Sequence, residues 1–157
     1  METSPNLPLQ MLRAQIGQDI RNSPSPFGQW LGGKMLKAER GVIEIEYLVR
    51  KEMTNPAGTL HGGVIAAIMD DLIGVTMFST GETTFKISVN LNVDFFYPAR
   101  TGERVIGKTR ILKEGKQLLN AVGELYHENG RLMATAASNL FNSNLRIGAP
   151  TPPGGGS

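Results

Sequence analysis

A glycine-rich turn that holds an amide and an imidazole leads into an apolar stretch of the chain. Asn55 lies in the turn, and His61, Gly62 and Gly63 end it at the start of the apolar run 61–79. If that run is a helix, its first backbone N–H groups lack an intrahelical acceptor and carry partial positive charge. The two glycines remove side chains that would block a ligand. The turn is therefore predicted to bind a carbonyl oxygen that becomes negative during a reaction; the structural alternative is a helix start made of ordinary turn residues.

Asp70 and Asp71 place two carboxylates inside the same apolar run. A buried carboxylate is costly unless it is paired or used, and the structural alternative is that either one reaches solvent or accepts a hydrogen bond. On a helix the two side chains would point about 100° apart. No Asp, Glu or His lies three or four positions away to complete a set of ligands, so we expect no metal site.

His61 and Asp70 are too far apart on one helix to act on the same small group. Their separation in the sequence corresponds to about 13 Å along a helix axis. If both are catalytic, the site must form between two subunits whose helices run antiparallel. The sequence therefore predicts a homodimer at least, and we expect a homotetramer.

An antiparallel sheet around one central helix is predicted to position these residues. The run 61–79 is apolar on nearly every helical face, which is typical of a buried helix, and its two Asp residues make a membrane span too costly. The run 85–95 alternates without a break, so its apolar residues are expected to face the helix and its polar residues, Ser88 included, to face away. Further strands are predicted at 35–39, 43–49, 103–112, 117–127 and 131–142. Hairpin-length connections between them indicate an α+β domain.

The two ends of the chain differ from its middle, because seven of the nine prolines lie in the first 26 residues or the last eight. An amphipathic helix is predicted over 7–21, and Phe27, Trp30 and Leu31 are expected to be packing anchors in a glycine-rich turn. The expected divisions are an N-terminal helical extension, a main domain and a flexible tail, at residues 1–26, 27–145 and 146–157.

Composition narrows the class of protein. The 157 residues fit one domain, and 16 Lys plus Arg against 14 Asp plus Glu leave a net charge of only +2. That excess is too small to indicate nucleic acid or an anionic membrane as a partner. The lack of cysteine excludes disulfides, cysteine-based metal sites and a Cys nucleophile. The first residues lack a cationic segment followed by an apolar run, so we expect a cytoplasmic protein.

One segment imitates a phosphate-binding loop. Residues 102–109, GERVIGKT, match the pattern GxxxxGK[ST], which needs a strand before the loop and a helix after it. Here the apolar pairs 105–106 and 111–112 are typical of strands. We therefore expect no helix at Lys108 and no site for a nucleoside triphosphate.

The spacing of the candidate site residues resembles that of a known family. The sequence contains the pattern N-x5-H-G-G-x6-D followed by a serine, and its members are Asn55, His61, Gly62, Gly63, Asp70 and Ser88. This pattern is similar to that of the hotdog-fold acyl-CoA thioesterases of the PaaI (phenylacetate-degradation) type, and the resemblance covers about residues 27–142. It implies an antiparallel sheet wrapped around a long helix, dimers that pair into tetramers, no cofactor, and active sites at the dimer interface.

The resemblance also implies a role for each residue. Asn55 and the Gly62 amide would polarise the thioester carbonyl. Asp70 of the facing subunit would act as a general base on water or as a direct nucleophile. Ser88 would position the water, and His61 would orient Asn55 or assist the departing thiolate.

The leading hypothesis from the sequence is an enzyme that hydrolyses an acyl- or aryl-acyl-CoA to a free acid and CoA. Gly63 is expected to contact the substrate, and Lys108 and Arg110 the phosphates of CoA, although a solvated strand face is the simpler interpretation of the two cations. Two alternatives stay open. One is a hotdog-fold dehydratase on CoA or carrier-protein thioesters, which needs a His and an acid close together, and the other is an acyl-CoA-binding protein without catalysis.

Overall fold

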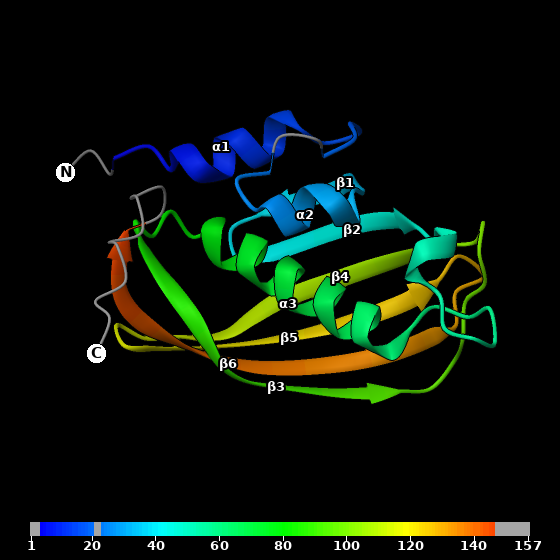
Figure 1. Cartoon of the computed structure of the whole chain (residues 1–157). Helices are drawn as coiled ribbons and strands as arrows, with labels where there is room; N and C mark the ends of the chain where they lie inside the picture. The colour runs from blue at the N-terminus through cyan, green and yellow to red at the C-terminus, as the bar shows by residue number, and fades with distance from the viewer. Residues whose placement is uncertain (1–3, 21–22, 147–157) are drawn as a thin grey trace, which may run out of the picture.

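An antiparallel sheet wraps around one long helix in the computed structural model, which describes residues 4–20 and 23–146 (Figure 1). The helix is α3 (Gly62–Phe78), and the strands follow the order β1-β2-β4-β5-β6-β3. The strands are β1 (Lys34–Glu39), β2 (Val42–Leu48), β3 (Thr84–Phe95), β4 (Arg104–Glu114), β5 (Leu118–His127) and β6 (Leu132–Arg146). The predicted α+β class and hotdog fold are confirmed. Of the tail predicted at 146–157, only residue 146 is among the described residues.

The core lies between α3 and the inner face of the sheet. Its helix side consists of large apolar residues, all shielded from solvent, namely Ile68, Met69, Leu72, Ile73 and Met77. Two strand glycines let the helix approach closely. A Cβ at Gly107 would lie 2.6 Å from the Leu72 side chain, and one at Gly123 would lie 3.1 Å from Met69 Sδ. Their missing side chains therefore set how deeply α3 sinks into the sheet.

Strand β3 contradicts the predicted unbroken alternation. Its pairing with β6 shifts between Ser88 and Asn90, so Val89 is an extra residue and forms a β-bulge. Beyond the bulge Leu91 packs against the core as expected. Before the bulge Ile87 faces outward and stays 44% exposed. A bulge reverses which residues face the helix while the apolar and polar residues still alternate along the chain, so the pattern could not show it.

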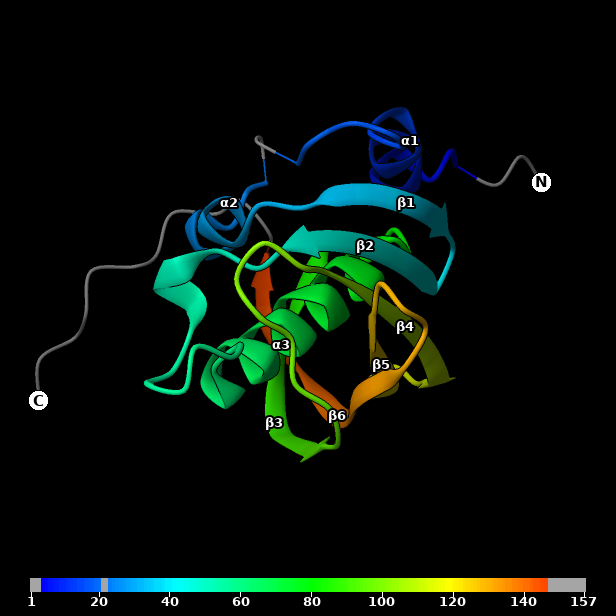
Figure 2. The same cartoon turned by 90° about the vertical axis from the view of Figure 1, so that its right-hand side faces the viewer.

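The N-terminal helix is shorter than predicted. It is α1 (Leu7–Ala14) and not a helix over 7–21. Gly17 adopts φ of +81°, a conformation that ends helices, and its N–H donates to the Met35 carbonyl at 2.8 Å. Residues 17–20 therefore run along the edge of β1, and Figure 2 shows α1 lying beside the same strand.

A short helix, α2 (Pro26–Leu31), stands where a glycine-rich turn was predicted. Leu31 is buried, which confirms it as a packing anchor. Phe27 and Trp30 instead stack on each other at the surface, with 5.7 Å between ring centroids, and each is more than two-fifths exposed. The prediction was therefore wrong for these two residues.

Strand β4 confirms that the segment 102–109 is not a phosphate-binding loop. The backbone from Arg104 to Glu114 is one strand, paired with β2 on one side and β5 on the other. No helix begins at Lys108. Within residues 4–20 and 23–146, no helix is long and apolar enough to cross a membrane.

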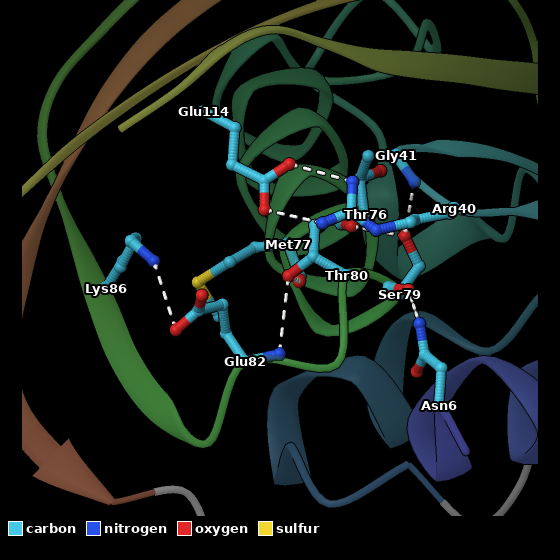
Figure 3. A network of polar contacts seen from close by, with 10 residues as sticks. All are labelled: Asn6, Arg40, Gly41, Thr76, Met77, Ser79, Thr80, Glu82, Lys86 and Glu114. Carbon is cyan, nitrogen blue, oxygen red and sulfur yellow. Dashed lines mark hydrogen bonds and ion pairs between the residues drawn. The ribbon is translucent and has the colours of Figure 1, made fainter. Parts of the chain in front are cut away.

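The C-terminal end of α3 is tied to distant parts of the chain (Figure 3). Ser79 Oγ accepts a hydrogen bond from the Gly41 N–H at 2.8 Å, and the Ser79 carbonyl accepts one from Asn6 Nδ2 at 2.9 Å. Thr80 Oγ1 donates to the Met77 carbonyl at 2.7 Å. The last carbonyls of the helix thus find donors, which satisfies the groups that a helix end leaves open.

Candidate active site

A compact turn after η1 (Lys51–Met53) fixes the side chain of Asn55. Its Oδ1 accepts hydrogen bonds from the Ala57 N–H at 3.0 Å and the Thr59 N–H at 3.1 Å, and its Nδ2 donates to Thr59 Oγ1 at 2.9 Å. Gly58 completes the turn with φ of +74°, which side chains disfavour. A primary amide has two N–H donors, so one Nδ2 proton remains without an acceptor among the described residues.

His61 is the N-cap of α3, and Gly62 is its first residue. His61 Nδ1 accepts a hydrogen bond from the Gly63 N–H at 2.8 Å, which places the ring proton of the neutral imidazole on Nε2. The N–H groups of Val64 and Ile65 donate to the His61 carbonyl. The Gly62 N–H has no acceptor in the described part of the chain, so it is the free donor at the positive end of the helix.

The two glycines contribute space in different ways. A Cβ at Gly63 would lie 3.0 Å from His61 Nδ1, so the lack of a side chain lets the imidazole cap the helix. The Gly63 amide is already occupied by that ring. A Cβ at Gly62 would lie 3.4 Å from the ring of Phe95 on β3. The free Gly62 amide is therefore next to an exposed aromatic ring.

Asp70 lies midway along α3 on its exposed face. Ser88 Oγ donates to Asp70 Oδ1 at 2.8 Å. The contact depends on the bulge at Val89, which turns Ser88 toward the helix although the sequence predicted that it faces away. This hydrogen bond orients the carboxylate through Oδ1 and leaves Oδ2 able to accept a proton.

Asp71 is directed away from this face and lies under α2. Ser25 donates a hydrogen bond to its carboxylate, and a Cβ at Gly28 would lie 3.2 Å from both of its oxygens. Burial raises the pKa of Asp71, the hydrogen bond from Ser25 opposes that rise, and the charge of Asp70 adds to it. Asp71 therefore has the structural role that the sequence left open.

The candidate residues form two groups within one chain. His61 and Gly62 form the N-terminal end of α3, and the turn that holds Asn55 closes directly before it, whereas Asp70 and Ser88 meet at the middle of the helix. Gly62 and Asp70 are eight positions apart, about 12 Å along the axis. One chain therefore does not bring the two groups to a common small ligand.

Lys108 and Arg110 lie on the face of the sheet opposite α3. Thr109 between them points inward and is buried. Lys108 is paired in register with Glu44 on β2 and Glu124 on β5, so acidic neighbours flank it on both sides. The two cations line an outer hollow of about 510 Å³. They belong to neither of the two groups around α3.

Thr59 and Val89 are two contributors that the sequence reasoning missed. Thr59 holds Asn55 through its amide and its hydroxyl, and an Asn followed by a Gly and a Thr in a turn is a signal that could have found it. Val89 gives no such signal. Within residues 4–20 and 23–146, no three His, Asp or Glu side chains are grouped so that they could hold a metal ion.

Comparison with known proteins matches residues 57–134 to the thioesterase superfamily. The chain is 32% identical to acyl-coenzyme A thioesterase 13 of Homo sapiens over 101 residues, which is 64% of this chain and 72% of that protein. A phenylacetic acid degradation-related protein from Ralstonia eutropha is 30% identical, with a TM-score of 0.71 over 84% of this chain and 96% of that one. Zebra fish thioesterase superfamily member 2 is 26% identical, with a TM-score of 0.72 over 90% of this chain and 100% of that one.

The segment 57–134 contains α3, β3, β4 and β5, and the similarities confirm the family that the N-x5-H-G-G-x6-D pattern indicated. The sequence match covers most of the human relative, and the structural match covers nearly all of the Ralstonia protein. The chain therefore belongs to the thioesterase superfamily.

Proposed function

We propose that this protein hydrolyses acyl-CoA thioesters to a free acid and CoA, at a site that two protomers build together. The observation that carries the proposal is Asp70, an exposed carboxylate midway along α3 that accepts a hydrogen bond from Ser88. This contact holds one carboxylate oxygen in place and leaves the other accessible to a proton. The human relative is named an acyl-coenzyme A thioesterase, which supports CoA thioesters as the substrate class.

The N-terminal end of α3 polarises the thioester carbonyl. The free Gly62 N–H and the second Nδ2 proton of Asn55 donate to the carbonyl oxygen, and the oxygen gains negative charge as the carbon becomes tetrahedral. Donors that are fixed before the reaction stabilise this charge without reorganisation. Thr59 fixes Asn55, and the cap by His61 fixes the start of the helix.

Asp70 of the facing protomer supplies the base. Its free Oδ2 takes a proton from water while the water oxygen bonds to the carbonyl carbon. Collapse of the tetrahedral intermediate then breaks the C–S bond, and the departing thiolate receives the proton that Asp70 holds. Ser88 keeps the carboxylate oriented throughout. Direct attack by Asp70 on the carbonyl carbon is an alternative that needs the same placement.

An open sheet edge supports the partner protomer. In the described part of the chain β3 pairs only with β6, whereas the outer edge of β1 is covered by residues 17–20. A twelve-residue edge strand with unpaired backbone groups invites pairing. A two-fold axis beside β3 makes the α3 helices of the two copies antiparallel, so the start of one helix approaches Asp70 on the other.

A homotetramer in the cytoplasm remains our expectation for the assembly and its location. Lys108 and Arg110 are on the sheet face opposite α3. They can therefore bind the phosphates of CoA only if the outer sheet face of a neighbouring protomer lies close to the site around α3. Under that proposal, Lys108→Gln or Arg110→Gln raises KM more than it lowers kcat. An unchanged KM in both variants rejects this role.

Release of free thiol from a panel of acyl- and aryl-acyl-CoA substrates tests the proposed function. Thiol release that saturates with substrate supports a thioesterase. A change at the acyl α and β carbons without thiol release indicates the dehydratase, and binding without turnover indicates an acyl-CoA-binding protein. Sedimentation under assay conditions tests the shared site, since an active monomer would contradict it.

A further inference from the structure

The β-bulge at Val89 places two kinds of residue on the same face of β3. Ser88 before the bulge and Leu91 after it both point toward α3, because they pair with Leu140 and Ser138, which lie on the buried face of β6. In a strand without the bulge, Ser88 and Leu91 would face opposite ways. The hydrogen bond between Ser88 and Asp70 therefore depends on the extra residue.

Hydrophobic burial alone favours the other register. Removing the bulge would turn Ile87 toward the helix and Ser88 away from it. Ile87 is now 44% exposed, so that change would bury apolar surface, which is favourable. Some interaction must therefore hold the bulge against this tendency.

Asn90 makes that interaction directly after the bulge. Its side-chain Oδ1 accepts a hydrogen bond from the Asn139 N–H at 2.9 Å, and its backbone carbonyl accepts one from Ser138 Oγ at 2.9 Å. Asn120 extends the row, since its Nδ2 donates to Asn139 Oδ1 at 2.8 Å. Side chains thus join β3, β6 and β5 at the point where the pairing shifts.

We propose that Asn90 is a positioning residue for thioester hydrolysis, because it locks the bulge that turns Ser88 toward Asp70. The inference rests on the proposed function, in which Asp70 is the base. Asn90 does not touch the reacting atoms, and it acts through Ser88. Its side-chain oxygen is the group that matters, since this oxygen is the acceptor for the Asn139 N–H.

A double-mutant cycle with Ser88 tests the inference. Asn90→Ala is expected to lower kcat by about tenfold with little change in KM, close to the loss in Ser88→Ala and in the range of one hydrogen bond. Combining the two substitutions is expected to lower kcat no further, because both remove the same contact. Asn90→Asp keeps an acceptor oxygen and is expected to restore most of the kcat.

Asn92 provides the matched control. It lies two residues along the same strand and has no side-chain hydrogen bond with any described residue, so Asn92→Ala is expected to keep the wild-type kcat. If the reductions in kcat of Asn90→Ala and Ser88→Ala multiply in the double variant, the inference is wrong. It is also wrong if Asn92→Ala lowers kcat as much as Asn90→Ala does, because either result indicates a general effect on the sheet.

A crystal structure of Asn90→Ala separates this inference from the proposed function. We expect Ser88 to have moved away from Asp70. If the Ser88–Asp70 hydrogen bond is intact while Ser88→Ala is impaired, the positioning role of Asn90 is wrong and the proposed function stands. If Ser88→Ala has full kcat, the role of Ser88 in the proposed function is wrong and the positioning role falls with it.

Discussion

The two ends of α3 are built in opposite ways. At the C-terminal end, Ser79 and Thr80 are buried, and Ser79 accepts hydrogen bonds from Asn6 and from the Gly41 N–H, which tie the end to other elements. At the N-terminal end His61 is exposed, and the Gly62 N–H has no acceptor in the part of the chain that the structure describes. The fold therefore provides hydrogen-bond partners at the C-terminal end of the helix and leaves one N–H donor available at the N-terminal end.

The C-terminal end of α3 therefore contributes to stability, whereas the N-terminal end keeps a hydrogen-bond donor available for a ligand. Unpaired donors are tolerated where solvent or a ligand can reach them, and they are costly where neither can. Substitutions at the open end and along the exposed face should reduce activity with little effect on stability. Substitutions at the closed end should do the reverse.

The largest expected effect is that of Asp70→Asn on the exposed face. Asn has nearly the same size but accepts no proton, so kcat should fall by about 100-fold or more, the scale for losing a general base. KM, thermal stability and oligomer size should change little. Steady-state kinetics of thiol release and sedimentation provide the measurements.

Asp71→Asn is the matched control, because Asp71 lies under α2 and not on the exposed face. It should keep most of the activity. Loss of turnover in Asp71→Asn together with normal turnover in Asp70→Asn would show that the assignment is off by one position. If neither variant is slower, the carboxylate mechanism has to be abandoned.

The next effect is that of Gly62→Pro at the open end. Proline is accepted at the first position of a helix, and His61 already has φ of −63° and ψ of 134°, which suits a residue before proline. The substitution therefore removes one N–H with little change in fold. We expect kcat to fall by about 100- to 1000-fold, as for loss of one oxyanion donor, and the melting temperature to change little.

Gly62→Ala separates the amide from the space around it. It keeps the N–H and adds a Cβ 3.4 Å from the Phe95 ring, so most of the activity should remain. If Gly62→Ala is as slow as Gly62→Pro, crowding beside Phe95 explains both losses and the amide has no catalytic role.

At the closed end, Ser79→Ala should act on stability and spare catalysis. It removes the acceptor of the buried Gly41 N–H, and an unsatisfied buried donor costs about 1–3 kcal/mol. For a chain of this size, each kcal/mol lowers the melting temperature by about 2–4 °C. Calorimetry should show this loss while kcat at 25 °C stays at the wild-type value; a reduced kcat would mean that the two ends of α3 are coupled.

The smallest effect concerns the pH dependence of stability through Asp71. Its folded pKa is above the ordinary value of 3.8, so the folded chain binds this proton more tightly than the unfolded chain. The free energy of unfolding should therefore fall as the pH rises from that value through the raised pKa. Asp71→Asn cannot ionise and should lack this fall. Urea denaturation of both proteins over this pH range measures it, and parallel curves would contradict the assigned environment.

Much of the fold could be predicted from the sequence because it follows from local patterns. The apolar run around Asp70 predicted the central helix, and turns at glycine and Asn-Gly predicted the strands of the sheet. The spacing of His61 and Asp70 predicted that the two are too far apart along one helix to act on the same small group, since helix rise per residue is constant. The structure agrees on the helix, the sheet and this separation, and a site shared by two subunits stays a prediction.

The failures have a common cause. Gly17 ends α1 early because its backbone can reach the left-handed region and bond to β1, and Ile16 and Ile20 had suggested a longer helix. Phe27 and Trp30 stack on the surface, where Arg50 donates a hydrogen bond to the Trp30 carbonyl and lies over the Trp30 ring. In each case contacts between distant segments decided between local conformations of similar energy.

The sequence by itself determined which groups are available: an amide and a glycine N–H at one end of a helix, and a carboxylate in its middle. Periodicity and residue type carry that information, because helix and strand geometry repeat along the chain. Only the tertiary structure decided how Ser88 faces. The direction of its side chain depends on one extra residue in β3, at the point where Ser138 and Asn139 of β6 form hydrogen bonds with Asn90. A pairing between strands far apart in sequence leaves no periodic trace in either strand.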